Sequence, residues 1–181
     1  YAHSLNLIGN SCTFSAIDGI HEAVIEEDQI AVRMGDVDKI ESIGEDSYLH
    51  TGSPHYILWT QDLDNFDLIR EAHKIRYSPN YAAEGVNVNV VERQSGQLKV
   101  RTYERGVEGE TFSCGTGVTA VALADYFRHN GEQHREIETK GGVLVIHFDA
   151  SGQTFTNIKM TGPAEFVYKG IFQFDVDEIG G

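Results

Sequence analysis

The feature of this chain that most constrains its fold is an almost uninterrupted apolar run, VTAVALADYF, at residues 118–127. Small and apolar residues on every side are typical of a helix that is buried all round rather than along one stripe. Such a helix has to be enclosed by other elements. Most of the remaining chain consists of short alternating patterns, so we expect strands to wrap around it. The predicted fold class is α/β of the α+β type, with a mainly antiparallel sheet around a central helix.

Alternation of apolar and polar residues predicts most of the strands, and Gly, Pro and Asp mark the turns between them. A further helix is predicted in NFDLIREAHKI, which spaces its apolar residues on one face and ends before Pro79. We expect Gly131 to cap the apolar helix, and residues 1–10 to be the end of a helix. The predicted strand segments are TFSAIDG, HEAVIEED, QIAVRMG, SYLHTGSPHYILWT (two strands hinged at Gly52-Ser53-Pro54), VNVNVVER, QLKVRTYER, REIETK, VLVIHF, TFTNIKM and EFVYKGIFQF.

Composition excludes several function classes. The 181 residues carry a formal net charge of −14, and the cations are scattered, which argues against a nucleic-acid partner. No apolar run is long enough to cross a bilayer, so we expect no membrane partner. Cys12 and Cys114 give neither a disulfide framework nor a metal motif, and a reducing cytoplasm is the expected compartment. The histidines show no metal spacing, and no cofactor motif is evident, so we expect neither a metal nor a cofactor.

Cys114 stands where the segment RTYERGVEGETFSCGTG, residues 101–117, meets the apolar helix. The first amides of a helix lack internal partners and carry the positive end of its dipole, which favours a thiolate. The amides of Gly115 and Thr116 are candidates to seat a carboxylate, because glycine permits close approach. Taken alone, a cysteine here is more often an inert buried thiol. The position nevertheless predicts a reactive sulfur beside an anion site.

The segment YERGVEGETFSCGTG resembles the second active-site signature of the diaminopimelate epimerase family. The chain also contains the motifs TGSPH, GVNVNV, VRMG and TGPAEFVYKG, placed in that family's order and spacing. The resemblance implies two pseudo-symmetric lobes, each a sheet around a central helix, with the active site between them. It makes residues 1–34 a remnant of the first lobe, with a helix end and strands. Residues 35–165 become a complete second lobe, and residues 166–181 a return strand with an acidic tail.

The same resemblance implies cofactor-independent epimerisation of LL-diaminopimelate to meso-diaminopimelate, in lysine and cell-wall biosynthesis. Inversion needs two acid/base groups on opposite faces of the α-carbon, and thiol pKa values suit both tasks. The family takes its other cysteine from a CGNG-type motif that this sequence lacks, and Cys12 in GNSCTFS has no such context. We therefore expect Cys114 to be one catalytic thiol of an incomplete, poorly active fragment.

Further site residues are carried over by the resemblance, and each has a simpler structural reading. His55 is placed near the thiols, where it would tune proton transfer, although a histidine after a Pro turn is more often a packing residue. The resemblance places Glu104 among both the catalytic and the substrate-binding groups, and it places Arg105 at the distal end of a zwitterionic substrate. The simpler reading is that these two adjacent charges form a solvated pair. Asn87 would donate to substrate, and Ser53 stands where the family often has Asn.

Two other function classes remain open from the residues. One is another amino-acid racemase or dehydratase on the same fold, although Glu104 and Arg105 favour a substrate with a second charged end. The other is a non-catalytic lobe that binds an amino acid or assembles with another chain. The expected partner is a small-molecule amino-acid substrate, diaminopimelate, and a homodimer is an open possibility. Three polar residues are assigned structural roles: Asn89, Asp18 and Glu22.

Overall fold

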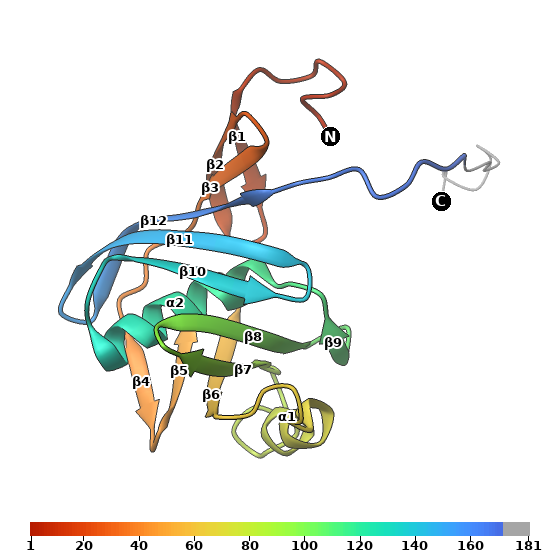
Figure 1. The fold of residues 1–181 in the computed structure, drawn as a ribbon. Coiled ribbons are helices and arrows are strands. Elements are labelled where there is room, and N and C mark those ends of the chain that lie inside the picture. The colour runs from red at the N-terminus through yellow and green to blue at the C-terminus, as the bar shows by residue number, and fades with distance from the viewer. Residues whose placement is uncertain (172–181) are drawn as a thin grey trace.

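The structure is a computed structural model and describes residues 1–171. Within these residues the chain forms the mainly antiparallel sheet and central helix expected from the sequence (Figure 1). The helices are α1 (Leu68–Arg76) and α2 (Gly115–His129). The strands are β1 (Ser11–Ala16), β2 (Gly19–Glu26), β3 (Gln29–Arg33), β4 (Ile40–Ile43), β5 (Asp46–His50), β6 (Pro54–Thr60), β7 (Asn87–Gln94), β8 (Gln97–Glu104), β9 (Gly109–Thr111), β10 (His134–Thr139), β11 (Gly142–Ser151) and β12 (Thr154–Pro163).

The strands join in one continuous sheet, in the order β1-β2-β3-β12-β11-β10-β8-β7-β6-β5-β4, and β9 pairs with β8. The pairs β6–β7 and β8–β10 are parallel, whereas the other pairs are antiparallel. Strands β4 to β8 and β10 to β12 curl around α2, while β1 to β3 extend away from this body (Figure 1). The early strands are attached through β3, which pairs with β12 near the end of the described chain.

Helix α2 is buried because almost every side chain on it is small or apolar. Its residues from Gly117 to Asp125 are all buried, and Val118, Val121 and Leu123 are fully enclosed. They pack into one cluster with strand residues such as Ile137 and Ile158. At about 25 cal/mol for each Å² of apolar surface, this helix is a large share of what stabilises the fold.

The polar positions of α2 are satisfied within the protein. Thr119 Oγ1 donates to Gly115 O at 3.0 Å, which occupies a carbonyl of its own helix. The buried carboxylate of Asp125 forms an ion pair with Arg93 at 2.9 Å and accepts a hydrogen bond from Arg135 at 2.6 Å. The helix ends at Asn130, which has a φ of 57° and takes the capping position expected of Gly131. Its amide donates to the Tyr126 carbonyl at 2.7 Å, which satisfies one of the last carbonyls of the helix, and Gly131 follows with a φ of 101°.

Helix α1 lies on the outside of the sheet and packs against β7 and β8. Asp67 caps its start, since its side chain accepts a hydrogen bond from the Arg70 amide. Leu68 and Ala72 point into a second apolar cluster that contains Tyr103. The amphipathic pattern read from the sequence therefore predicts this helix, but only part of its buried face. Phe66 and Ile75 pack against the cluster as the pattern indicates, whereas Ile69 is 41% exposed.

Four segments differ from the sequence-based expectation. Residues 1–10 form turns rather than a defined helix end, and the short strands β4 and β9 were not predicted. The strand expected in EFVYKGIFQF is wrong for residues 165–171, which pair with no strand in the described chain; the rest of that segment lies outside the described residues. No helix within residues 1–171 is long and apolar enough to cross a membrane.

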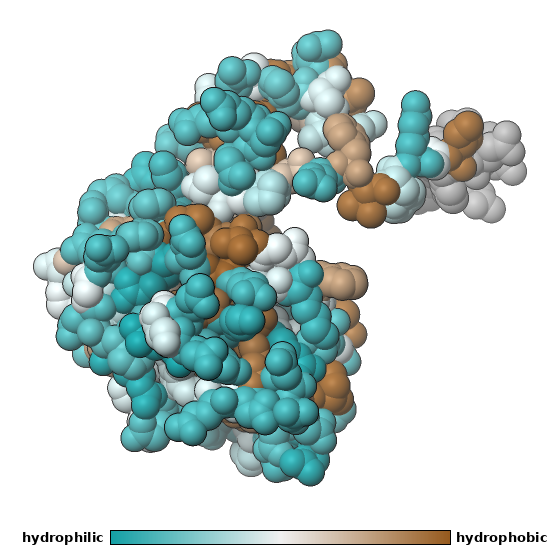
Figure 2. Space-filling model, viewed as in Figure 1, coloured by the Kyte–Doolittle hydropathy of each residue, from teal (hydrophilic) through white to brown (hydrophobic). Residues whose placement is uncertain are grey.

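The molecular surface is mostly polar in the view of Figure 2. Apolar residues gather along the extended segment that follows β12 and where the early strands meet the main body (Figure 2). Phe166 of that segment is 74% exposed and lies edge-to-face with Tyr1, with ring centroids 6.2 Å apart. Apolar surface of this kind is typical of a region that contacts further protein.

Candidate functional site

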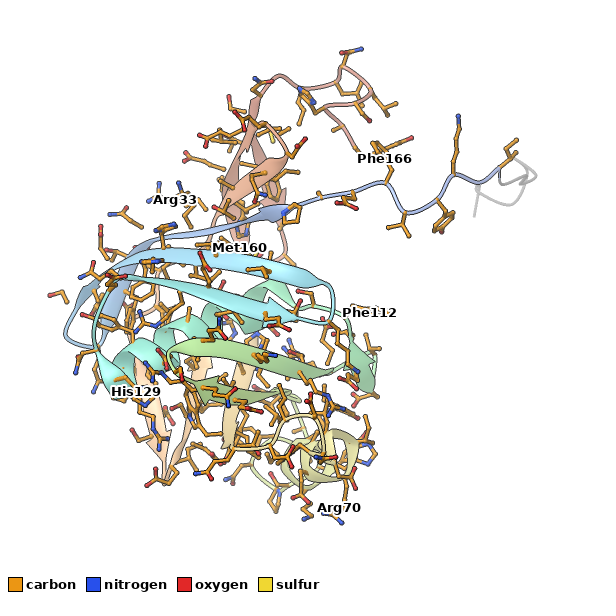
Figure 3. The ribbon with its side chains drawn as sticks, viewed as in Figure 1. Arg33, Arg70, Phe112, His129, Met160 and Phe166 are labelled. Carbon is orange, nitrogen blue, oxygen red and sulfur yellow. The ribbon has the colours of Figure 1, made fainter. Side chains whose placement is uncertain are left out.

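A shallow hollow of about 390 Å³ lies where the β1–β2 hairpin faces the start of α2. We call it the Cys114 hollow. Met160 of β12, which is labelled in Figure 3, forms part of it. A Cβ on Gly115 would lie only 3.0 Å from the Met160 sulfur. The absence of a side chain on Gly115 thus lets β12 approach the helix start. The hollow is lined by Phe14, Ala16, Asp18, His21, Val32, Met34, Glu104, Ser113, Cys114, Gly115, Thr116 and Met160.

Cys114 is the N-cap residue of α2, as its position in the sequence predicts. Its carbonyl accepts the first helical hydrogen bond, from Val118 N at 2.8 Å, and its side chain does not cap the helix. The sulfur lies 3.5 Å from Thr116 Oγ1 and also faces the Gly117 amide. The helix start therefore presents a thiol together with donors that favour its ionised form.

Burial opposes that effect. It raises the pKa of the Cys114 thiol above its ordinary value, and the nearby Glu104 carboxylate adds to the rise. The Thr116 hydroxyl and the Gly117 amide act in the opposite direction but do not prevail. The expectation of a depressed pKa at the helix start is therefore wrong for this conformation, because the desolvation of a side chain only 8% exposed outweighs the helix dipole. At neutral pH the resting group is a thiol rather than a thiolate.

His55 lies on β6, fully buried behind the helix start rather than in the hollow. Its Nε2 is 3.0 Å from Thr116 Oγ1, and its Nδ1 is 3.0 Å from Asn89 Nδ2. Burial lowers the pKa of His55 to about 3, and the charges of His50 and Arg105 act in the same direction. The imidazole is consequently neutral, and it reaches the thiol through Thr116.

The structure brings Glu104, Gly115 and Thr116 into the hollow, but it gives the predicted binding residues Asn87, Ser53 and Arg105 protein partners. The Asn87 amide donates to Ser53 Oγ at 3.0 Å and to Pro54 O at 3.3 Å, and Asn87 Oδ1 accepts from the Arg105 amide. The Arg105 guanidinium donates to the Glu84 carbonyl at 2.7 Å. In this conformation Asn87 holds the loop of Arg105 against the turn of Ser53, and the exposed Arg105 lies beside the hollow rather than in it.

Asp18 and His21 line the hollow, although the sequence did not indicate them as site residues. His21 Nε2 is 3.0 Å from Asp18 Oδ1, His21 Nδ1 is 2.9 Å from the Arg33 carbonyl, and the ring of Phe14 stacks on the imidazole. The Arg33 carbonyl and then the Asp18 carboxylate raise the pKa of His21, while hydrogen bonding to His21 lowers the pKa of Asp18. Only the pairing of β3 with β12 brings this hairpin to Cys114, so no local sequence pattern reveals it.

The described residues hold no group of His, Cys, Asp and Glu side chains that could bind a metal ion. The chemistry that the arrangement can support is proton transfer at one face of a small ligand. A buried thiol, a carboxylate and the free amides of a helix start lie together in an open hollow.

Comparison with known sequences gives a consistent result. A family model described as diaminopimelate epimerase matches residues 47–167. A diaminopimelate epimerase of Flavobacterium psychrophilum is 44% identical over 174 residues, covering 93% of this chain and 67% of that protein. The enzyme of Aquifex aeolicus is 30% identical over 193 residues and covers 98% and 67%. The enzyme of Methanocella arvoryzae is 44% identical over 130 residues, yet only 44% of its own length is covered.

Solved structures with little sequence identity share the fold. A hydroxyproline epimerase from Agrobacterium vitis superposes with a TM-score of 0.65 at 13% identity, over 90% of this chain and 61% of the other. A phenazine biosynthesis protein of the PhzF family from Bacillus anthracis gives a TM-score of 0.64, also at 13% identity, over 90% and 69%. These likenesses support the α+β architecture and carry no information about the reaction.

Proposed function

The chain belongs to the diaminopimelate epimerase family, and we propose that it supplies one half of an active site that interconverts LL- and meso-diaminopimelate without a cofactor. The observation that carries this proposal is Cys114 at the start of a buried helix, with Glu104 beside it in the same hollow. The relatives named above are longer than the aligned region, so the activity of a whole enzyme is part of the proposal.

In this proposal Cys114 acts at one face of the substrate α-carbon. The α C–H bond breaks on the opposite face, where a base takes the proton, and the Cys114 S–H delivers a proton to the near face to form the new C–H bond. Cys114 is then a thiolate, which serves as the base in the reverse direction. The raised pKa of Cys114 supports this role, because the resting group holds the proton that it has to donate.

Negative charge develops on the α-carboxylate as the proton leaves. The first amides of α2 belong to Gly115 and Thr116, which line the hollow, and they carry the positive end of the helix dipole. We assign them to the carboxylate. Arg105 is assigned to the distal end of the substrate, where a guanidinium can grip a second carboxylate with two parallel hydrogen bonds. That role requires it to exchange its hydrogen bond to the Glu84 carbonyl for the ligand.

The proposal also covers how the site is divided. We infer that residues 35–165 form one lobe around α2 and that residues 1–34 belong to a second lobe, with the hollow at their junction. Support comes from the way β1 to β3 extend away from the body that encloses α2 (Figure 1). The second acid/base group would approach from the first-lobe side. Because the sequence contains only Cys12 and Cys114, we expect these 181 residues alone to invert the substrate weakly.

The test is substrate protection of Cys114, which does not require full turnover. The protein is alkylated with iodoacetamide at several pH values, with and without meso-diaminopimelate, and each cysteine is quantified by mass spectrometry. We expect diaminopimelate to protect Cys114, hydroxyproline to give no protection, and Cys12 to label independently of ligand. Deuterium exchange at the α-carbon should be lost in Cys114→Ser and kept in Cys12→Ser. Equal protection by hydroxyproline would favour another racemase of this fold, and no protection by either would refute the proposal.

Arg105→Lys tests the distal end separately. A lysine keeps the charge but cannot form the two parallel hydrogen bonds, so the concentration of diaminopimelate that protects Cys114 should rise on the order of tenfold. The same substitution should leave protection by alanine, which has no distal end, unchanged. An equal effect on both ligands would show that Arg105 acts on the fold rather than on the distal end.

A further inference from the structure

A line of polar side chains runs behind the Cys114 hollow from β8 to the start of α2. Thr102 lies on β8 and Asn89 lies opposite it on β7; both are buried, and neither has a role in the reaction proposed above. We propose that Asn89, anchored by Thr102, is a positioning residue that fixes which nitrogen of His55 carries the proton, so that the Thr116 hydroxyl keeps its hydrogen available for the Cys114 thiolate. The role that we give this hydrogen-bond chain rests on the function proposed above, whereas the contacts that form it do not depend on that function.

The orientation of the Asn89 amide is set from two sides. Its Nδ2 lies 3.4 Å from the Tyr56 carbonyl, which can only accept, so the nitrogen and not the oxygen faces β6. Its Oδ1 accepts a hydrogen bond from Thr102 Oγ1 at 2.9 Å. This oxygen lies so close to the helix that a Cβ on Gly117 would be 2.5 Å away. The glycine therefore makes room for the amide.

The tautomer of His55 follows from that orientation. Asn89 Nδ2 has hydrogens to give and no lone pair to offer, so His55 Nδ1, 3.0 Å away, has to be the unprotonated nitrogen. The proton of the neutral ring is then on Nε2, which donates to Thr116 Oγ1 at 3.0 Å. A doubly protonated ring would place a hydrogen of Nδ1 against a hydrogen of the amide. The buried environment, which lowers the pKa of His55 to about 3, agrees with this conclusion.

The last link follows from the tautomer. His55 Nε2-H donates to Thr116 Oγ1, so the hydroxyl hydrogen is not taken by His55 and is free for the Cys114 sulfur at 3.5 Å. A thiolate has no hydrogen to give, so in that form of Cys114 the hydroxyl is the donor of this contact. The Thr116 carbonyl is separately held by Thr51 Oγ1 at 2.8 Å, which fixes the first turn of the helix. Every link from Thr102 to the sulfur thus points the same way, and the sulfur receives a hydrogen bond that stabilises its thiolate.

This arrangement answers a difficulty posed by the site. A thiol that acts as acid in one direction and base in the other needs both forms within reach of neutral pH. Burial and Glu104 push the pKa of Cys114 upward, and a fixed donor is needed to oppose them. An ionisable histidine in direct contact would supply a variable charge, whereas a neutral histidine of fixed tautomer supplies a constant dipole. Asn89 and Thr102 keep it constant.

Asn89→Asp reverses the chain with almost no change of shape. A carboxylate would draw the proton to His55 Nδ1, so that Nε2 accepts from Thr116 and the hydroxyl hydrogen turns away from sulfur. In a Cys12→Ser background, we expect the alkylation midpoint of Cys114 to move to higher pH. Its rate below that midpoint should fall about tenfold for every pH unit by which the midpoint rises. Thr116→Val, which removes the hydroxyl, should also move the alkylation midpoint of Cys114 to higher pH. Thr116→Ser, which keeps the hydroxyl, should leave the midpoint unchanged. Asn80→Asp, at an exposed position, is the matched control.

Long-range ¹H–¹⁵N NMR of the unaltered protein reads the His55 tautomer directly. Nε2-H is expected, and an Nδ1-H tautomer or a doubly protonated ring would overturn the proposal even if every variant misfolded. An unchanged Cys114 profile in folded Asn89→Asp and Thr116→Val proteins would also overturn it. None of these measurements uses a substrate, so their failure is separate from failure of the epimerase assignment. Conversely, a confirmed donor chain with no ligand protection of Cys114 would refute only the assigned reaction.

Discussion

Replacing Glu110 by glutamine removes one charge from β9, the strand that leads to Cys114, and should destabilise the fold in a pH-dependent way. Glu110 accepts from the Arg101 guanidinium at 2.8 and 3.0 Å, and Lys140 Nζ lies 2.7 Å from its Oε1. Hydrogen bonding to Arg101, assisted by Lys140, lowers the pKa of Glu110 from 4.5 to about 2. Arg101 also donates to two backbone carbonyls of the loop before α1, so this cluster joins three segments.

The magnitude follows from the pKa. A fall from 4.5 to about 2 is equivalent to about 3 kcal/mol, since one pH unit corresponds to about 1.4 kcal/mol. The Glu110 side chain is 18% exposed and glutamine keeps one acceptor, so we expect Glu110→Gln to lower the free energy of unfolding by about 2 kcal/mol near neutral pH. The folded-state pKa lies below the unfolded one. The stabilisation is therefore complete above pH 4.5 and is lost as the pH falls toward 2.

Urea unfolding of both proteins at a series of pH values measures this difference. The gap between them should be constant above the unfolded-state pKa and should close as acid protonates Glu110. Glu136→Gln is the control, because Glu136 is exposed on β10 and forms no ion pair with any residue from 1 to 171. A gap that is absent at neutral pH, that persists in acid, or that the control reproduces would refute the reasoning.

Two further substitutions test other parts of the structure. The Asp125 side chain is only 1% exposed, and Asp125→Asn leaves the cations around it without their counter-charge. The free energy of unfolding should therefore fall by about 3 kcal/mol, and the melting temperature should fall with it. An unchanged melting curve would contradict this account of the end of α2. Gly52→Ala would place a Cβ 2.3 Å from Asp18 Oδ2 at a φ of 94°, and should cost about 1–3 kcal/mol in urea unfolding. Gly44→Ala, at a φ of 63° with no atom within 4 Å, should cost less, and equal losses would show that the contact is unimportant.

Local patterns predicted those elements whose burial is decided within their own segment. The alternating runs of β7 and β8 and the apolar run of α2 each have one energetically acceptable arrangement, and the structure has it. The short strands β4 and β9 carry too few residues for a pattern. The segment at 165–171 has a strand-like composition, but no described strand offers it an edge. Propensity alone cannot supply a hydrogen-bonding partner.

The same distinction applies to the candidate site, where some features could be predicted from local sequence and others depend on tertiary structure. The position of Cys114 at the helix start could be read from the glycines and apolar residues that follow it. Its pKa could not, because burial depends on strands distant in sequence. The roles of Thr102 and Asn89 and the presence of His21 in the hollow depend on strand register and on the β3–β12 pairing. Each is a tertiary fact without a local signature.

The pairing of β3 with β12 also has a consequence for how this protein is made. Residues 29–33 are synthesised early, yet the edge that they offer is covered only when residues 154–163 have left the ribosome. At about 5–20 residues per second, the wait is on the order of ten seconds. During that time β1 to β3 can form only a local meander with an unpaired edge, which other nascent chains could extend. A high contact order of this kind predicts slow folding and a dependence of soluble yield on temperature and chaperone supply.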